Sequence, residues 1–161
     1  HIEFPDGDWG QCTAFAVPGS FVTAAHCVED IDSQIWLLDS QGALWETVLI
    51  QVDVNLDVAV LQSTLLAIPL KVGQTPQEDA QVASMSGVGG LGVLWSLRGR
   101  VAGQYPPWIG VQMPGFGPGG SGSPLLCGPK LNAVCGILLG GDALARVLPI
   151  SAWRTLIEVN P

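Results

Sequence analysis

Histidine is scarce in this chain, which narrows the places where acid–base chemistry near neutral pH could occur. Of the two histidines, His1 stands at the terminus, so His26 is the candidate imidazole base. It follows the apolar run FVTAA at residues 21–25, a pattern that predicts a strand with the ring at its end. A lone histidine is more often structural than catalytic, so the neighbouring groups must decide its role.

A candidate nucleophile lies in a glycine-rich segment, because residues 118–124 read PGGSGSP and place Ser121 between glycines. Glycine adopts backbone angles that a side chain would penalise, so such a loop can aim successive N–H groups at one point. Donors arranged in this way stabilise the oxyanion that develops when a hydroxyl attacks a carbonyl. A Gly/Ser-rich stretch by itself more often forms a flexible loop, but an apolar segment follows directly here.

Three motifs, in this order along the chain, resemble those of the chymotrypsin-like serine peptidases. Residues 23–27 (TAAHC) are similar to the histidine motif and residues 55–61 (NLDVAVL) to the aspartate motif. Residues 118–124 resemble the nucleophile loop, especially the G-x-S-G-S-P form of bacterial and viral members. The resemblance covers most of the chain, and the order His, Asp, Ser separates it from subtilisin-like and α/β-hydrolase enzymes.

The resemblance implies a catalytic triad and a serine endopeptidase that works through an acyl-enzyme. Ser121 would attack the substrate carbonyl while His26 takes up and returns the proton, and Asp57 would hold the imidazole in the required tautomer. The amides of Gly119 and Ser121 would form the oxyanion hole. Asp53 is the alternative to Asp57, but the apolar run that follows the family's aspartate stands directly behind Asp57.

The resemblance also predicts where a substrate side chain would bind. The predicted substrate-binding residues are Gly115, Phe116, Leu139, Gly140, Gly141 and Asp142. Glycine walls predict an open slot for an apolar or aromatic side chain, or for a basic one if Asp142 points inward instead of forming a hairpin turn. Leu139 stands where many relatives carry a serine that supports the aspartate. Gly120 replaces the acid that pairs with a freed N-terminus, so we expect no such activation switch.

The four cysteines form two local pairs, and neither has the C-x-x-C spacing of a zinc site. Disulfides are the favoured interpretation, with four isolated buried thiols as the alternative. The resemblance implies a bond between Cys12 and Cys27, because the family joins the cysteine after the histidine to one on the preceding strand. Cys127 and Cys135 would bracket a short hairpin. Disulfides persist in oxidising compartments, so we expect a secreted or otherwise extracytoplasmic protein.

Short apolar segments between glycine and proline turn signals predict an all-β protein. Together with the resemblance, they predict two packed six-stranded antiparallel β-barrels and a short C-terminal helix after Ser151. We expect a single peptidase domain, with an N-terminal lobe at 1–62, a connector at 63–78 and a C-terminal lobe at 79–161. The expected strands are 13–17, 21–24, 34–38, 44–52, 58–62, 81–86, 92–101, 108–112, 124–127, 134–139 and 143–148.

The composition argues against several other classes of protein. Fourteen acidic and six basic residues give a net charge of -8, the wrong sign for following a phosphate backbone. No apolar run reaches the roughly 18 residues that a membrane span needs. Residues 87–92 (GVGGLG) match a dinucleotide-binding pattern, but a strand rather than a helix is predicted after them, so we interpret them as a hairpin loop.

These observations predict a monomeric serine endopeptidase that acts on protein or peptide substrates, with a protein inhibitor as a further possible partner. We expect no cofactor, no metal, no nucleic acid and no membrane among its partners. Because the chain starts at His1 rather than Met, we expect a processed or excised product. The alternative is a catalytically silent relative that serves as a protein-binding module. Such relatives usually lose a triad residue, and none is missing here.

Overall fold

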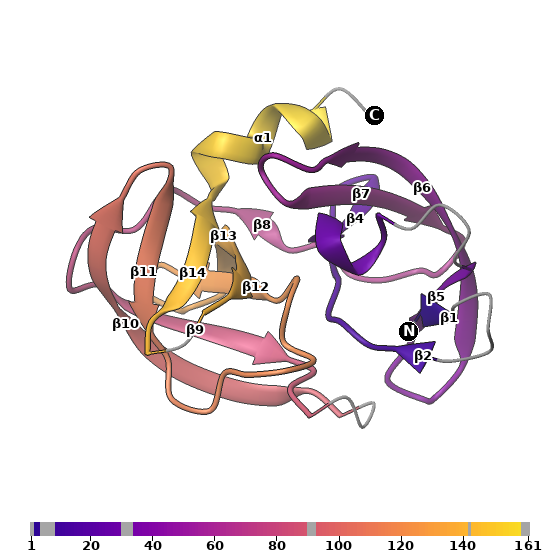
Figure 1. Cartoon of the computed structure of the whole chain (residues 1–161), viewed down its shortest axis with the longest axis horizontal. Helices are drawn as coiled ribbons and strands as arrows, with labels where there is room; N and C mark the ends of the chain where they lie inside the picture. The colour runs from indigo at the N-terminus through magenta and orange to yellow at the C-terminus, as the bar shows by residue number, and fades with distance from the viewer. Residues whose placement is uncertain (1, 4–8, 30–33, 90–92, 142, 159–161) are drawn as a thin grey trace.

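The computed structural model describes residues 2–3, 9–29, 34–89, 93–141 and 143–158. Figure 1 shows two β-sheet lobes side by side, with one α-helix lying across the top. The earlier half of the chain forms one lobe and the later half the other. None of the described helices is long and apolar enough to cross a membrane.

The first lobe is a sheet with the strand order β2-β1-β5-β6-β7-β4-β3. Its centre is apolar on both faces, because all four residues of the run VAVL at 58–61 are buried. Among the described residues no pairing joins the edge strands β2 and β3, so the sheet stays open. The strands are β1 (Ile2–Glu3), β2 (Trp9–Gly10), β3 (Phe15–Val17), β4 (Ser20–Ala24), β5 (Gln34–Leu38), β6 (Leu44–Asp53) and β7 (Val58–Ser63).

The second lobe is a closed six-stranded barrel in the order β12-β9-β10-β11-β14-β13, because β12 also pairs with β13. The two-residue strand β8 pairs in parallel with the first two residues of β13, Ala133 and Val134. The strands are β8 (Lys71–Val72), β9 (Gln81–Ser86), β10 (Trp95–Tyr105), β11 (Trp108–Gln112), β12 (Pro124–Cys127), β13 (Ala133–Gly140) and β14 (Ala145–Pro149). Closure leaves no exposed edge among the six barrel strands.

The prediction of two six-stranded barrels is therefore correct for the second lobe and wrong for the first. The reason lies in residues 11–14, which connect the edge strands β2 and β3. There the Thr13 N–H donates to the Ser121 carbonyl at 2.8 Å, and the Thr13 carbonyl accepts the Thr23 hydroxyl at 2.7 Å. The chain between the two edge strands is thus held against Ser121 and Thr23, and residues 11–14 form no strand.

Most of the expected strands are present with small shifts of their ends. Residues 34–38, 81–86, 108–112 and 124–127 match the structure exactly as predicted. The three two-residue strands β1, β2 and β8 were not predicted, because such short pairings have no periodicity to detect. The glycine cluster at 87–92 lies in the connection of the antiparallel pair β9–β10, and residues 90–92 are outside the described part.

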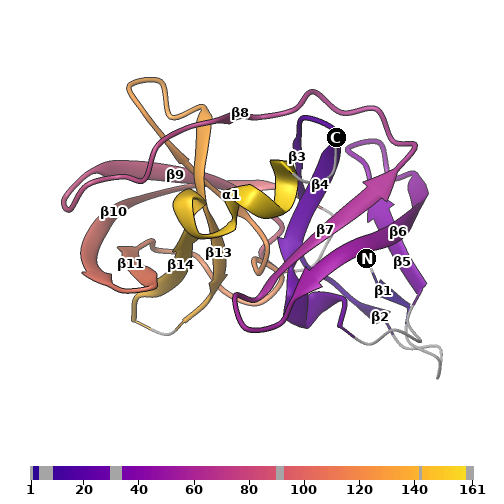
Figure 2. The ribbon, with the colours of Figure 1, turned by 90° about the horizontal axis from the view of Figure 1, so that it is seen from above.

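The C-terminal helix α1 (Ile150–Glu158) is confirmed, beginning directly after β14. Its Trp153 is fully buried and donates its indole N–H to the Leu148 carbonyl at 3.1 Å. The indole also meets the ring of Phe15 edge to face, with 6.0 Å between the centroids. Figure 2 shows α1 between the two lobes, so a helix that follows the second barrel completes the core of the first lobe.

Candidate active site

His26 and Asp57 meet because they lie at the ends of neighbouring antiparallel strands. The pairing of β4 with β7 sets Ala24 opposite Val58, and the chain then turns into a short 3₁₀ helix, η1 (Ala25–Cys27). The His26 backbone N–H donates to Asp57 Oδ1 at 2.8 Å, and Nδ1 of its ring lies 2.7 Å from Asp57 Oδ2. Both carboxylate oxygens are therefore used to orient one residue.

The Asp57 backbone has a φ of 61°, in the left-handed region that most side chains avoid. Aspartate tolerates this conformation better than most residues, and backbone of this kind persists where the surroundings fix it. Here the surroundings include the Ala25 N–H, which donates to the Asp57 carbonyl at 3.1 Å. The rival Asp53 instead accepts the Leu56 N–H at 2.9 Å and so caps the turn before Asp57.

The contact between His26 and Asp57 raises the pKa of the histidine and lowers the pKa of the aspartate. The hydrogen bond to Asp57 holds the pKa of His26 above its ordinary value of 6.5, helped by the negative charge of Glu29 and opposed by burial. Burial alone would raise the pKa of Asp57, but the hydrogen bonds and charge of His26 outweigh it, and this pKa falls below its ordinary 3.8. The pair therefore favours a carboxylate beside a protonated ring more than free side chains would.

Arg146 on β14 is a further neighbour of the pair. Its Nη2 lies 3.8 Å from Asp57 Oδ2, and its guanidinium stacks over the Trp108 ring at 4.7 Å from the centroid. The positive charge of Arg146 lowers the pKa values of both His26 and Asp57. The side chain is 49% exposed, so water screens this influence.

The Ser121 loop is tied to the neighbouring strand β13. The Gly122 N–H donates to the Leu138 carbonyl at 2.8 Å, and the Leu138 N–H donates to the Ser123 carbonyl at 2.9 Å. The Ser121 hydroxyl donates to the Leu139 carbonyl at 3.2 Å. Among the described residues, no hydrogen bond joins this hydroxyl to the ring of His26.

Two amides of this loop remain without a protein acceptor in the described part of the chain, those of Gly119 and Ser121. The carbonyl before each amide is bonded elsewhere. The Pro118 carbonyl accepts the Gly89 N–H at 2.8 Å, and the Gly120 carbonyl accepts the Ser123 N–H at 3.0 Å. Because the N–H of a trans peptide points away from its C=O, each of these amides points away from the partner that holds its carbonyl.

The two candidate segments are brought together where the lobes meet. A Cβ atom on Gly122 would overlap the carbonyl oxygen of Thr13 and lie 2.5 Å from the Thr23 hydroxyl and 3.1 Å from the Ala24 nitrogen. Gly122 has a φ of 89°, which also favours glycine. The Ser121 loop is thus packed directly against the strand that leads to His26.

The disulfide between Cys12 and Cys27 is confirmed, with an S–S distance of 2.01 Å. It joins the segment next to Thr13 to the residue after His26. A ring nitrogen of His26 and the sulfurs of Cys12 and Cys27 lie within 4.8 Å of one another, close enough to suggest a metal site. Because the sulfurs are bonded to each other, they offer no thiolate to a metal.

The second predicted disulfide is not formed, since Cys127 and Cys135 are free buried thiols. In the β12–β13 pair Cys127 faces Ala133, so Cys135 is its diagonal rather than its direct neighbour. The two thiols contact each other through a hydrogen bond and no bond joins the sulfurs. The Cys127 thiol and burial raise the pKa of Cys135, which makes that thiol unreactive.

The predicted substrate-binding set comprises Gly115, Phe116, Leu139, Gly140, Gly141 and Asp142. Phe116 is partly buried against the core of the second lobe. Leu139 is buried, and its carbonyl faces Ser121. Gly140 ends β13 with a φ of 146°, and Gly141 follows the strand with a φ of 135°. Asp142 lies outside the described residues.

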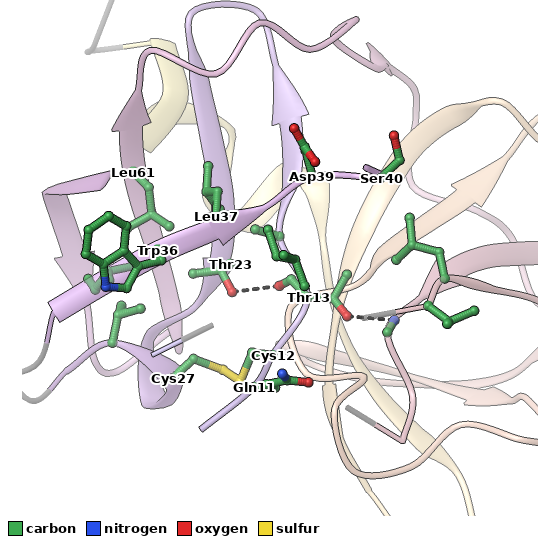
Figure 3. Close-up of a pocket in the computed structure, with 17 residues that line it drawn as sticks. Gln11, Cys12, Thr13, Thr23, Cys27, Trp36, Leu37, Asp39, Ser40 and Leu61 are labelled. Atoms are coloured by element: carbon green, nitrogen blue, oxygen red, sulfur yellow. Dashed lines mark hydrogen bonds between the residues drawn. A yellow bond between two sulfur atoms is a disulfide. The ribbon is translucent and has the colours of Figure 1, made fainter. Parts of the chain in front are cut away.

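A cavity of about 390 Å³ lies beside the disulfide, and Figure 3 shows the side chains that line it. The first lobe supplies most of its walls, including Trp36 and Leu61, and the second lobe supplies Gly87, Val93 and Leu94. The cavity therefore spans the seam between the lobes. None of the described residues in the predicted substrate-binding set lines it.

The sequence did not single out Thr13 or Arg146, although both contact the site. Thr13 directly follows Cys12, which the family resemblance links to Cys27 beside His26. This neighbourhood in the sequence was the one signal that could have placed Thr13 near the site. Arg146 offered none, because its approach to Asp57 depends on the pairing of β14 with β13, where Gly140 faces Arg146 across a bulge.

No protein-family model and no curated protein matches the chain, whereas many solved structures resemble it. A serine endoprotease from Yersinia pestis matches with a TM-score of 0.81 and 18% identity, over 98% of this chain and 60% of that one. The Rv3671c protease in an inactive form matches with a TM-score of 0.80 and 20% identity, over 99% and 86%. The chain thus spans less than two thirds of the Yersinia protein. These likenesses confirm the chymotrypsin-like fold.

Proposed function

We propose that the protein is a serine endopeptidase with His26 as general base and acid, Ser121 as nucleophile and Asp57 as the orienting carboxylate. The observation that carries the proposal is the double hydrogen bond between His26 and Asp57, at a seam against which the Ser121 loop is packed. A carboxylate on Nδ1 leaves Nε2 as the nitrogen that accepts a proton.

In the proposed reaction the Ser121 oxygen attacks the carbonyl carbon of a peptide bond while Nε2 of His26 takes the hydroxyl proton. The amides of Gly119 and Ser121 bind the resulting oxyanion, in the role that their unpaired N–H groups suit. His26 then gives its proton to the leaving amine, and an acyl-enzyme remains. Water repeats the sequence and releases the acid, which restores the free hydroxyl.

The proposal requires one change from the geometry described above. The Ser121 hydroxyl, which donates to the Leu139 carbonyl, must take Nε2 of His26 as its acceptor. A hydroxyl can turn about its bonds to suit a new partner, and catalytic hydrogen bonds of free enzymes often tighten only when substrate binds. We assign this change to substrate binding.

We further propose that the substrates are proteins or peptides and that the enzyme is a monomer, with a protein inhibitor as a further partner. The substrate side chain enters a slot formed by Gly115, Phe116 and the glycines after Leu139. A secreted or otherwise extracytoplasmic location agrees with the Cys12–Cys27 bond. The lobe boundaries at residues 62 and 79 remain part of the proposal.

A second candidate is a catalytically silent module that binds proteins. The observation in its favour is the hydrogen bond that directs the Ser121 hydroxyl to the Leu139 carbonyl instead of to His26. In this alternative the fold is kept as a scaffold and the serine never becomes nucleophilic.

Labelling with a fluorophosphonate separates the two candidates, because the reagent needs an activated serine. We expect one label per chain, located at Ser121 by peptide mass spectrometry, and none in Ser121→Ala or His26→Ala. Ser96→Ala, which changes an exposed serine on β10, is the matched control and should label like the wild type. A folded wild type that never labels would favour the binding module.

Turnover is measured separately with a proteome-derived peptide library. We expect Ser121→Ala to lose at least about 10³-fold in kcat/KM with an unchanged circular dichroism spectrum. Cleavage retained in Ser121→Ala would assign the reaction to another nucleophile. A preference for apolar, aromatic or basic residues before the cut tests the proposed slot.

A further inference from the structure

We propose that Thr13 is a positioning residue that holds the oxyanion-binding loop in its working shape, an inference that rests on the proposed peptidase function. Thr13 belongs to the first lobe, whereas the loop it contacts belongs to the second. Its side chain is 6% exposed, and Figure 3 shows it at the seam beside the Cys12–Cys27 bond.

The Thr13 hydroxyl makes two hydrogen bonds to two different segments of the second lobe. It donates to the Gly119 carbonyl at 2.9 Å and accepts the Gly87 N–H at 2.9 Å. A hydroxyl has one proton to donate, so this one is committed to Gly119. The side chain therefore links the nucleophile loop to the turn that follows β9.

The same turn makes a second contact with the loop, through the Gly89 N–H and the Pro118 carbonyl at 2.8 Å. The carbonyls of Pro118 and Gly119 flank the Gly119 Cα on its two sides, so both peptide planes around this residue are fixed from outside the loop. Thr13 holds one directly and supports the other through the turn at 87–89. Fixing the Pro118 carbonyl sets the direction of the Gly119 N–H, because the peptide is planar and trans.

External support matters at this position because glycine restricts its own backbone least. Gly119 has a φ of 89° and is followed by another glycine, and among the described residues the loop itself restrains the two peptides beside Gly119 only through the Gly120 N–H, which donates to the Gly117 carbonyl at 3.0 Å. The backbone of Thr13 is fixed in turn by Ser121 and Thr23. The first lobe thus supplies a rigid point against which the oxyanion hole is held.

The test compares Thr13→Val, which keeps the shape of the side chain but removes the hydroxyl, with Thr13→Ser, which keeps the hydroxyl. Thr47→Val is the matched control, because Thr47 is equally buried and its hydroxyl, among the described residues, donates only to the Trp45 carbonyl of its own strand. We expect Thr13→Val to lower kcat about 10- to 100-fold, less than the loss of a whole oxyanion donor. KM should stay within about twofold, and Thr13→Ser should keep most of the wild-type kcat.

A structural readout separates positioning from a local role. Amide hydrogen exchange of Gly89, whose N–H does not touch Thr13, should become about tenfold faster in Thr13→Val and stay unchanged in Thr13→Ser. If Thr13→Val does not fold, amide hydrogen exchange of the wild type alone still tests the inference. Its Gly87 and Gly89 amides should be protected before a peptide boronate is added and change little afterwards.

Three results would overturn the inference. The first is an unchanged kcat in a folded Thr13→Val, and the second is an equal loss of kcat in Thr13→Ser. The third is an unprotected Gly89 amide in the free wild type. A wild type that fails to label with fluorophosphonate overturns the proposed function as well, whereas a wild type and a Thr13→Val that label at the same rate overturn only the role of Thr13.

Discussion

Replacing Gly122 by alanine places a methyl group in the seam between the two lobes. The new Cβ would overlap the Thr13 carbonyl and lie 2.5 Å from the Thr23 hydroxyl. Neither neighbour is the free end of a flexible side chain, because the first is backbone and the second is held by its own hydrogen bond. The lobes must therefore separate slightly or the loop must change its path.

The cost has two parts that can be worked out from the structure. A side chain at the φ of 89° found for Gly122 costs about 1–2 kcal/mol. Overlap with well-packed neighbours typically adds about 1–3 kcal/mol. We expect Gly122→Ala to lower the free energy of unfolding by about 2–5 kcal/mol, which for a chain of this size lowers Tm by about 4–20 °C.

Gly128→Ala is the matched control, because Gly128 has a φ of 90° and a Cβ there would have no atom within 4 Å. It carries only the backbone cost of about 1–2 kcal/mol. Thermal and urea unfolding of both variants give the difference, which measures the close approach of the lobes. An equal loss of stability in the two variants would refute the packing described for Gly122.

The remaining predictions concern the His26 pair and the cysteines. Because the pKa of His26 is raised, kcat/KM should rise with pH about a midpoint above 6.5, and a midpoint below 6.5 would contradict this. Arg146 lowers the pKa of His26, so Arg146→Gln should move the NMR titration of the ring to higher pH, while unfolding changes by only about 0.2–1 kcal/mol; a shift to lower pH would reverse the sign we assign. Replacing Cys12 and Cys27 by serine should cost about 3 kcal/mol in urea unfolding, because the bond closes a loop with a sequence separation of 15; unchanged stability would exclude this contribution. Thiol titration of the unfolded, non-reduced chain should find two thiols per molecule, and finding none would indicate a second disulfide.

The parts of the fold that the sequence predicted are those with local signals. The run VAVL at 58–61 is apolar on both faces and is a central strand, and the turn residues around 81–86 and 108–112 mark the strand ends. The TAAHC and NLDVAVL motifs placed His26 and Asp57 at strand ends, and the structure brings these two residues into contact. The two sequence motifs and the pairing of β4 with β7 therefore lead to the same placement of His26 and Asp57.

What the sequence did not predict depends on register and on contacts between lobes. Cys127 and Cys135 remain free thiols in a pairing in which Cys127 faces Ala133, and the spacing of the cysteines carries no information about that pairing. In the open first sheet, residues 11–14 between the two edge strands form no strand, and Thr13 is hydrogen-bonded to the other lobe instead. Interactions of this kind join residues more than a hundred positions apart, so no local sequence pattern predicts them.

The buried position of Trp153 has a consequence for how the protein is made. Its indole packs in the core of the first lobe. A ribosome synthesises Trp153 only after every strand of the second lobe. Until then the first lobe of a nascent chain lacks part of its core and exposes apolar surface, which chaperones can bind. The core of the first lobe can therefore be completed only after synthesis has passed residue 153.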